Sequence, residues 1–90
     1  MGLEISKDDI RALLVKSLML KMEPEEISDE TPLFGLEGLG LDSIDALELV
    51  VSMEKNYGVG VANSGVAQSA LRNVASIYEY VNAERARKNA

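Results

Sequence analysis

The residues best suited to chemistry lie in one short segment, where a glycine-containing loop leads into a predicted helix: Leu39-Gly40-Leu41-Asp42-Ser43-Ile44-Asp45. A serine hydroxyl at the start of a helix points outward, and the chain has no His to act as its base and no Cys to replace it as a nucleophile. A self-contained hydrolase is therefore not expected. Ser43 is instead accessible as an acceptor for a group that another enzyme transfers, and the positive end of the helix dipole tolerates a phosphate-linked group there.

A second interpretation of Ser43 needs no chemistry. Judged as an isolated serine, it would simply be the first residue of a capped helix, with the Asp42 carboxylate accepting hydrogen bonds from the free amides of the first turn. Asp45 would add negative charge where the helix dipole is positive. The wider sequence has to decide between the two interpretations.

The helix that positions Ser43 is predicted over residues 43–57, and Gly58 supplies its stop. Its polar residues recur at spacings of three and four and predict one exposed stripe: Asp45, Glu48, Ser52 and Lys55. Apolar residues occupy most of the remaining circumference: Ile44, Leu47, Val50, Val51 and Met53. We expect a helix with a narrow solvated face and wide burial.

An earlier helix is predicted over residues 7–21, from a capping box formed by Ser6 and Asp9 to a stop before Pro24. The connection that follows, residues 22–41, is longer than an ordinary loop and rich in glycine. It contains too many apolar residues for a solvated linker: Leu33, Phe34, Leu36, Leu39 and Leu41. We expect this connection to fold back over the helices.

The signals are weaker after Gly58. Residues 59–61 could form a short extended stretch, and residues 66–71 a short helix. A final helix is predicted over residues 74–87, with Asn73 as its cap. The expected fold class is all-α: a small four-helix bundle with a long first loop and a short third helix.

Composition narrows the classes of function. The 90 residues fit one small domain, residues 1–90, whose core is aliphatic because 47% of the residues are hydrophobic and only 4% aromatic. No zinc pattern or phosphate-cradling loop is present, and a loose calcium-loop pattern fails because Leu47 stands where glycine is needed. We therefore expect no metal site. No apolar run reaches membrane-spanning length and no secretory signal is visible, so a cytoplasmic monomer without membrane insertion is expected.

The charge of the chain is concentrated in one region. The net charge is −6, yet residues 22–54 contain ten acids and no Lys or Arg. Such a region repels phosphate backbones, so nucleic-acid binding is not expected. It suits partners that present Arg and Lys, although a solvated acidic surface kept for solubility explains the charge alone equally well.

The pattern Gly40-Leu41-Asp42-Ser43-Ile44-Asp45, followed by Leu47-Glu48-Leu49, closely resembles the phosphopantetheine attachment signature of acyl carrier proteins. In that family the order is Gly, any residue, Asp, Ser, then Leu or Ile, and often Asp. The resemblance extends over most of the chain, because the family shares its short length, acidic balance, long first loop and late short helix. The modified serine of the family falls on Ser43, and its recognition acids fall on Asp42, Asp45, Glu48 and Glu54.

The resemblance implies a carrier rather than an enzyme. A phosphopantetheinyl transferase would move 4'-phosphopantetheine from coenzyme A onto Ser43, and the terminal thiol of that arm would hold acyl groups as thioesters. Synthases, acyltransferases or ligases with basic docking patches would bind the acidic helix during fatty-acid or related lipid biosynthesis. A carrier for a polyketide or amino-acid pathway is the nearest alternative, and an unmodified acidic helical adaptor is the alternative from another class.

The acyl chain could shelter between the helices, where the candidate lining residues are Leu39, Leu47, Met53, Val61, Val66, Leu71 and Ile77. Each of these residues fits an ordinary dry core equally well. Two departures from fatty-acid carriers indicate a specialised member: residues 61–68 contain no acid, and Lys55 follows Glu54 where further acids are common.

Overall fold

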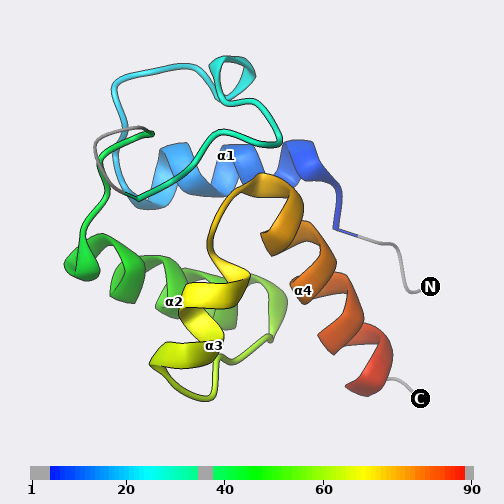
Figure 1. Cartoon of the computed structure of the whole chain (residues 1–90). Helices are drawn as coiled ribbons and strands as arrows, with labels where there is room; N and C mark the ends of the chain where they lie inside the picture. The colour runs from blue at the N-terminus through cyan, green and yellow to red at the C-terminus, as the bar shows by residue number, and fades with distance from the viewer. Residues whose placement is uncertain (1–4, 35–37, 89–90) are drawn as a thin grey trace.

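The computed structural model describes residues 5–34 and 38–88, and this part of the chain is helical (Figure 1). It contains the α-helices α1 (Lys7–Ser17), α2 (Ser43–Tyr57), α3 (Ser64–Ala70) and α4 (Val74–Lys88), and the short 3₁₀ helix η1 (Pro24–Glu26). Within the described ranges no strand is formed, and the only β-type pairing is an isolated bridge between Phe34 and Leu41. The expected all-α bundle with a long first loop and a short third helix is confirmed.

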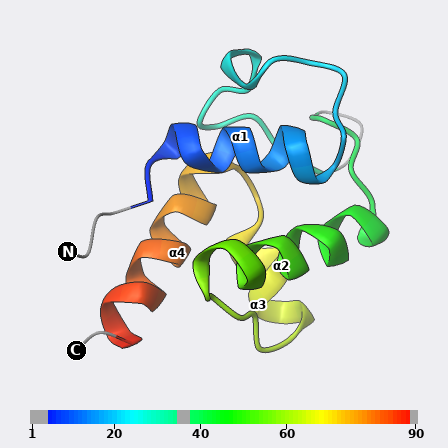
Figure 2. The same cartoon turned by 180° about the vertical axis from the view of Figure 1, so that it is seen from behind.

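The helices enclose one aliphatic core. In Figures 1 and 2, α1 lies above α2, and the long loop that carries η1 arches over the side of α1 that faces away from α2. Helix α4 packs against α1 and α3. Every long helix contributes side chains with no exposed surface, including Ile10 and Leu14 of α1, Leu49 and Met53 of α2, and Val74, Ile77 and Val81 of α4. None of the helices in the described ranges is long and apolar enough to cross a membrane.

The first helix starts as predicted and ends earlier than predicted. Ser6 and Asp9 form the capping box, with each side chain accepting the other's backbone N–H at 3.0 Å. The helix ends at Ser17 rather than near residue 21, because Met19 adopts a left-handed backbone with φ of 52° and the N–H of Leu20 turns back to the carbonyl of Val15. This reversal lets Leu18 and Leu20 pack against the core.

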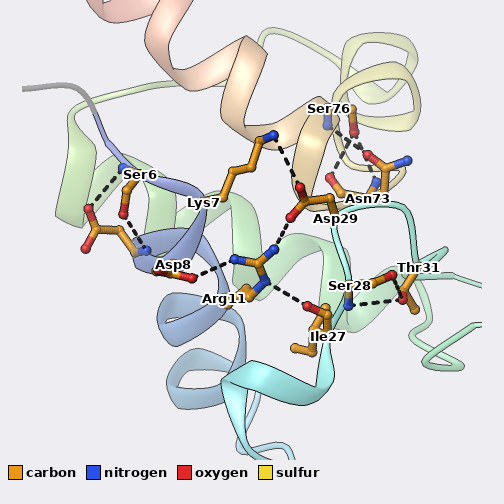
Figure 3. Close-up of polar contacts among 11 residues, drawn as sticks. Ser6, Lys7, Asp8, Arg11, Ile27, Ser28, Asp29, Thr31, Asn73 and Ser76 are labelled. Carbon is orange, nitrogen blue, oxygen red and sulfur yellow. Dashed lines mark hydrogen bonds and ion pairs between the residues drawn. The ribbon is translucent and has the colours of Figure 1, made fainter.

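The long loop is held to the helical core by an arginine of α1 (Figure 3). Arg11 Nε donates to the carbonyl of Ile27 at 2.7 Å, and its terminal nitrogens pair with Asp8 at 2.7 Å and with Asp29. Lys7 also pairs with Asp29, at 3.2 Å, while the Asp29 carbonyl accepts the N–H of Ala75 at the start of α4. One loop residue therefore joins α1 to α4.

Loop residues at and after this anchor complete the core. Ile27, Leu33 and Leu41 are buried, while Phe34 and Leu39 pack against the core from its edge. The prediction that the apolar loop folds back on the helices is confirmed for these residues, and Leu36 lies outside the described residues. Two hydrogen bonds hold Leu33 in place, since its N–H donates to the carbonyl of Arg72 and its carbonyl accepts the N–H of Leu41.

The short third helix begins two residues earlier than predicted. Asn63 caps it by accepting the N–H of Val66 at 2.9 Å, so the helix starts at Ser64. Residues 59–61, where a short extended stretch was expected, belong to no helix or strand. Two contacts hold this segment: Val59 is buried, and the Tyr80 hydroxyl donates to the carbonyl of Gly60. Asn73 caps α4 as predicted, with its side chain accepting the N–H of Ser76 at 2.8 Å.

Candidate functional site

Ser43 is the first residue of α2, and its side chain is exposed to solvent. The turn around it is fixed by its two acidic neighbours. Asp42 Oδ1 accepts the N–H groups of Ile44 and Asp45 at 3.0 and 3.1 Å, and Asp45 Oδ2 accepts the N–H of Asp42 at 3.1 Å. The Ser43 hydroxyl forms no hydrogen bond to a described residue, so it is accessible for modification while the backbone that carries it is held rigidly.

The chain reaches this helix start through a glycine turn. Gly40 has a φ of 73°, in the left-handed region that side-chain-bearing residues rarely adopt. The next residue, Leu41, is buried and pairs with Leu33, which ties the turn to the core. Gly40 therefore lets the backbone enter the core at Leu41 and leave it again at Asp42, directly before Ser43.

The surface of α2 carries acids and a large apolar stripe. Asp42, Glu48 and Glu54 are exposed and Asp45 is half-buried, so all four predicted docking acids have access to solvent. The same surface exposes three large apolar side chains at helical spacing: Ile44 at 70%, Leu47 at 64% and Val51 at 44%. This set of three residues is called the apolar stripe below.

The apolar stripe corrects the expectation that α2 is widely buried. Only Leu49 and Met53 of this helix lie in the core, because the long loop covers the far side of α1 and leaves the outer face of α2 uncovered. A domain of this size cannot bury apolar residues on most sides of a 15-residue helix. The number of apolar residues in α2, set against the small size of the domain, was therefore the sequence signal for an exposed apolar face. Exposed apolar patches mark binding surfaces.

An open groove of about 780 Å³ begins beside Ser43 and runs between α2, α3 and the end of the long loop. It is lined by Pro32, Phe34, Ser43, Ala46, Leu47, Val50, Val61, Asn63, Ala67, Gln68, Leu71 and Arg72. Most of this lining is hydrocarbon. An apolar chain attached near Ser43 can therefore reach the groove without crossing the core.

The structure brings only some of the predicted lining residues to this groove. Leu47, Val61 and Leu71 line it, whereas Met53 and Ile77 lie in the core with no exposed surface. Leu39 is half-buried at the edge of the core, outside the groove. Val66 lines a separate hollow of about 380 Å³ between α3 and α4.

Sequence reasoning did not find the loop side of the groove or its polar residues. Pro32 and Phe34 reach it because the buried Leu33 between them fixes that part of the loop, a contact set by the distant carbonyl of Arg72. Asn63 and Gln68 reach it from the start of α3 and its second turn. The amphipathic pattern of a seven-residue helix is too short to reveal which of its polar side chains face a groove.

Tyr57, the last residue of α2, has a structural role. Burial raises the pKa of Tyr57 to about 12, with the charge of Asp9 acting in the same direction and Arg85 opposing it. Its hydroxyl donates to the Asp9 carbonyl at 3.3 Å. Tyr57 therefore stays neutral and joins the end of α2 to α1. Among the described residues, no group of three or more Asp and Glu side chains is arranged to hold a metal ion.

Comparison with known proteins shows the family of the chain. The model of the family described as "Phosphopantetheine attachment site" matches residues 8–81, which includes α2 and the groove. The chain belongs to this family. Its members bind 4'-phosphopantetheine covalently and act as acyl carrier proteins rather than catalysts, so this chain is a carrier that uses that group.

Several curated acyl carrier proteins are similar to the chain over most of its length. The acyl carrier protein of Wolinella succinogenes is 28% identical over 78 residues, which cover 87% of this chain and 95% of the relative. That of Campylobacter curvus is 30% identical over 74 residues, covering 82% of this chain and 88% of the relative. A probable acyl carrier protein of Streptomyces halstedii is 30% identical over 60 residues, covering 67% and 64%.

The residues at the start of α2 fit the prosthetic group of this family. Ser43 offers a free hydroxyl on an exposed helix start, and the rigid Asp42 and Asp45 turn presents it without blocking it. The nearby groove gives an attached apolar chain a place out of water. The chain has no His that could act as a base for Ser43. This is expected of a serine that a separate enzyme modifies.

Proposed function

We propose that this carrier accepts its phosphopantetheine arm on Ser43 and serves fatty-acid or related lipid biosynthesis as a specialised member of the family. The observation that carries the proposal is the free Ser43 hydroxyl on an exposed helix start, directly beside an apolar groove. When bound, the arm supplies a thiol that holds acyl groups as thioesters. A chain without Cys thereby takes part in thioester chemistry.

The residues around Ser43 present its hydroxyl to the transferase. Asp42 and Asp45 satisfy the first-turn amides and fix the serine backbone. No described side chain competes for the Ser43 hydroxyl as a hydrogen-bond partner, so its lone pairs stay available for attack on phosphorus. The transferase, rather than this chain, would remove the hydroxyl proton.

The groove would shelter the acyl chain between enzyme encounters. Phe34 and Pro32 of the loop, Leu47 and Val50 of α2 and Leu71 beyond α3 present hydrocarbon to it. Burying apolar surface in such a groove stabilises by about 25 cal/mol per Å² of area removed from water. An acyl chain lying there is also kept from water and from unrelated nucleophiles.

Partner enzymes would bind the exposed face of α2. Its acids, Asp45, Glu48 and Glu54, flank the apolar stripe of Ile44, Leu47 and Val51. A partner with basic residues around an apolar spot fits this arrangement, because apolar contacts at the centre of an interface supply affinity while charges at its rim raise the association rate. Two features support a specialised pathway: the seven residues of α3 carry no charge, and Lys55 is exposed.

Transfer of an arm and an acyl group tests the carrier role. The protein is incubated with an acyl-coenzyme A, magnesium and a phosphopantetheinyl transferase, and its intact mass should rise by one acyl-phosphopantetheine. Hydroxylamine should then remove the acyl part alone, as expected for a thioester. An unchanged mass would support the unmodified adaptor instead.

Charge reversal on α2 tests the docking surface. Asp45→Lys with Glu48→Lys should slow transfer at low salt, and the difference should shrink as salt screens the charges. The matched control is Glu25→Lys with Glu30→Lys, which changes the net charge equally on exposed acids of the long loop. Equal slowing in both pairs would mean that net charge, rather than the α2 surface, guides the partner.

The cytoplasmic location and the monomeric state stay predictions.

A further inference from the structure

The two walls of the groove differ in chemistry. Beyond Ser43, the α2 residues that line the groove have hydrocarbon side chains: Ala46, Leu47 and Val50. The α3 side is lined by Asn63 and Gln68, whose side chains end in amides. A saturated hydrocarbon chain cannot form hydrogen bonds with amides. The presence of amide side chains beside the groove therefore helps to indicate which kind of acyl chain it binds.

The Asn63 amide is oriented by its role as the cap of α3. Its Oδ1 accepts the N–H of Val66 at 2.9 Å. Because the partner is a donor, the bonded atom must be the oxygen, and the nitrogen is the atom left over. Nδ2 donates no hydrogen bond to a described residue, so it offers two N–H groups in a fixed direction.

The Gln68 amide is free as well. It lies within the seven-residue α3 and its side chain is exposed at the rim of the groove. It forms no hydrogen bond to any residue that the structure describes. The α3 wall thus has two residues with side-chain amides whose N–H donors have no partner among the described residues.

A saturated chain and an oxygenated chain would meet this wall differently. A saturated chain lying along α3 would displace water from the amides and give no acceptor in return, which is unfavourable. A chain with a carbonyl or hydroxyl oxygen could accept from Nδ2 of Asn63 or Nε2 of Gln68 while its carbon atoms cover Leu47 and Val50. Loss of water would then be offset by a new hydrogen bond.

We propose that the groove selects acyl chains that carry a neutral oxygen beyond the thioester, held by the side-chain amides of Asn63 and Gln68. The inference rests on the proposed function, since it assumes that the arm on Ser43 delivers an acyl chain to this groove. It names the substrate class of the carrier as oxygenated acyl groups rather than saturated ones.

Protection of the thioester from a chemical nucleophile tests the selection without any partner enzyme. The protein is loaded with an octanoyl chain, with its analogue bearing a ketone at the penultimate carbon, or with an analogue ending in a carboxylate. Intact mass first confirms each load, so a failure of the proposed function shows at this step. Hydroxylamine cleavage is then timed and divided by the rate for the same thioester on free pantetheine.

We expect the ketone chain to be protected about fivefold more than the octanoyl chain, the effect of roughly one net hydrogen bond. Asn63→Asp keeps an oxygen to cap α3 and removes the donor, and Gln68→Leu removes the second amide. The preference should fall in one or both variants and persist in Asn56→Asp, which makes the same change on an exposed residue of α2. Circular dichroism checks that each variant is folded.

Several results would overturn the proposal. Equal protection of the ketone and octanoyl chains in the native protein would do so, as would a ketone preference that survives both variants or disappears in Asn56→Asp. Stronger protection of the carboxylate chain would assign selection to Arg72, which also lines the groove. The side-chain amide NMR signals provide an independent check. If they shift on attachment of the arm and not on addition of the ketone chain, the amides bind the arm and the proposal is wrong.

Discussion

Replacing Asp29 by Asn should loosen the long loop and destabilise the whole fold. Asn keeps the shape and the oxygen of Asp29 but loses the charge that pairs with Lys7 and Arg11 (Figure 3). The Arg11 side chain is only 16% exposed, so its charge relies on its partners in the protein rather than on water. After the change, Arg11 keeps the exposed Asp8 and the carbonyl of Ile27.

The size of the effect follows from the exposure of the two ion pairs. Pairs in full solvent contribute about 0–1 kcal/mol, and removal of one partner from a fully buried pair costs about 3–5 kcal/mol. Asp29 is 37% exposed and Arg11 is mostly buried, so we expect a loss of about 1–2 kcal/mol. In a domain of this size each kcal/mol lowers the Tm by about 4–8 °C, which gives a fall of about 4–16 °C.

Thermal and urea unfolding, followed by circular dichroism, measure this loss. Lys7→Met should cost less than Asp29→Asn, because Lys7 is more exposed than Arg11. Arg87→Gln breaks a 2.6 Å ion pair with Glu84 in which the Arg87 side chain is 71% exposed, and it should change stability little. If Asp29→Asn destabilised the protein no more than Arg87→Gln, the loop would not be held by its charges, and the anchoring role of Asp29 would be wrong.

Three further predictions concern single residues and partners. Met19→Gly should raise stability by about 1 kcal/mol, because Met19 is 83% exposed and has a positive φ that glycine adopts without strain; a lower Tm would show that its side chain makes a contact that matters. Burial raises the pKa of Tyr57 to about 12, so between about pH 10 and that value the unfolded chain loses a proton that the folded chain keeps, and stability falls as pH rises. Tyr57→Phe should remove this part of the fall, and an unchanged pH dependence would count against the buried environment. General fatty-acid elongation enzymes should use this carrier more slowly than a housekeeping carrier, because α3 is uncharged and Lys55 is exposed; equal rates across a range of salt would remove the support for a specialised pathway.

The helix boundaries that follow local rules could be predicted from the sequence. The caps at Ser6, Asp42 and Asn73 and the glycine stop at Gly58 depend on residues within one turn, and the structure confirms all four. The end of α1 could not be predicted in this way. Its stop uses a left-handed Met19, a residue type that gives no stop signal.

The features that depend on long-range packing were not predictable from local patterns. The exposed face of α2 follows from where the long loop lies, and the loop is placed by Arg11, which is 18 residues from Asp29 in sequence. The groove has the same origin, since Phe34, Leu47, Val61 and Leu71 meet only after four separate segments have packed. Sequence alone could predict a site at Ser43 and its acidic neighbours because that constellation is contiguous in the chain.

The attachment of the arm to Ser43 is the central claim, and peptide mapping of the modified protein tests it most directly. After incubation with coenzyme A, magnesium and a phosphopantetheinyl transferase, fragmentation should place one phosphopantetheine on Ser43. Ser43→Ala should fold as the native protein does, because Asp42 still caps α2, and should gain no mass. Modification at another serine such as Ser52, or a mass gain that persists in Ser43→Ala, would contradict the account.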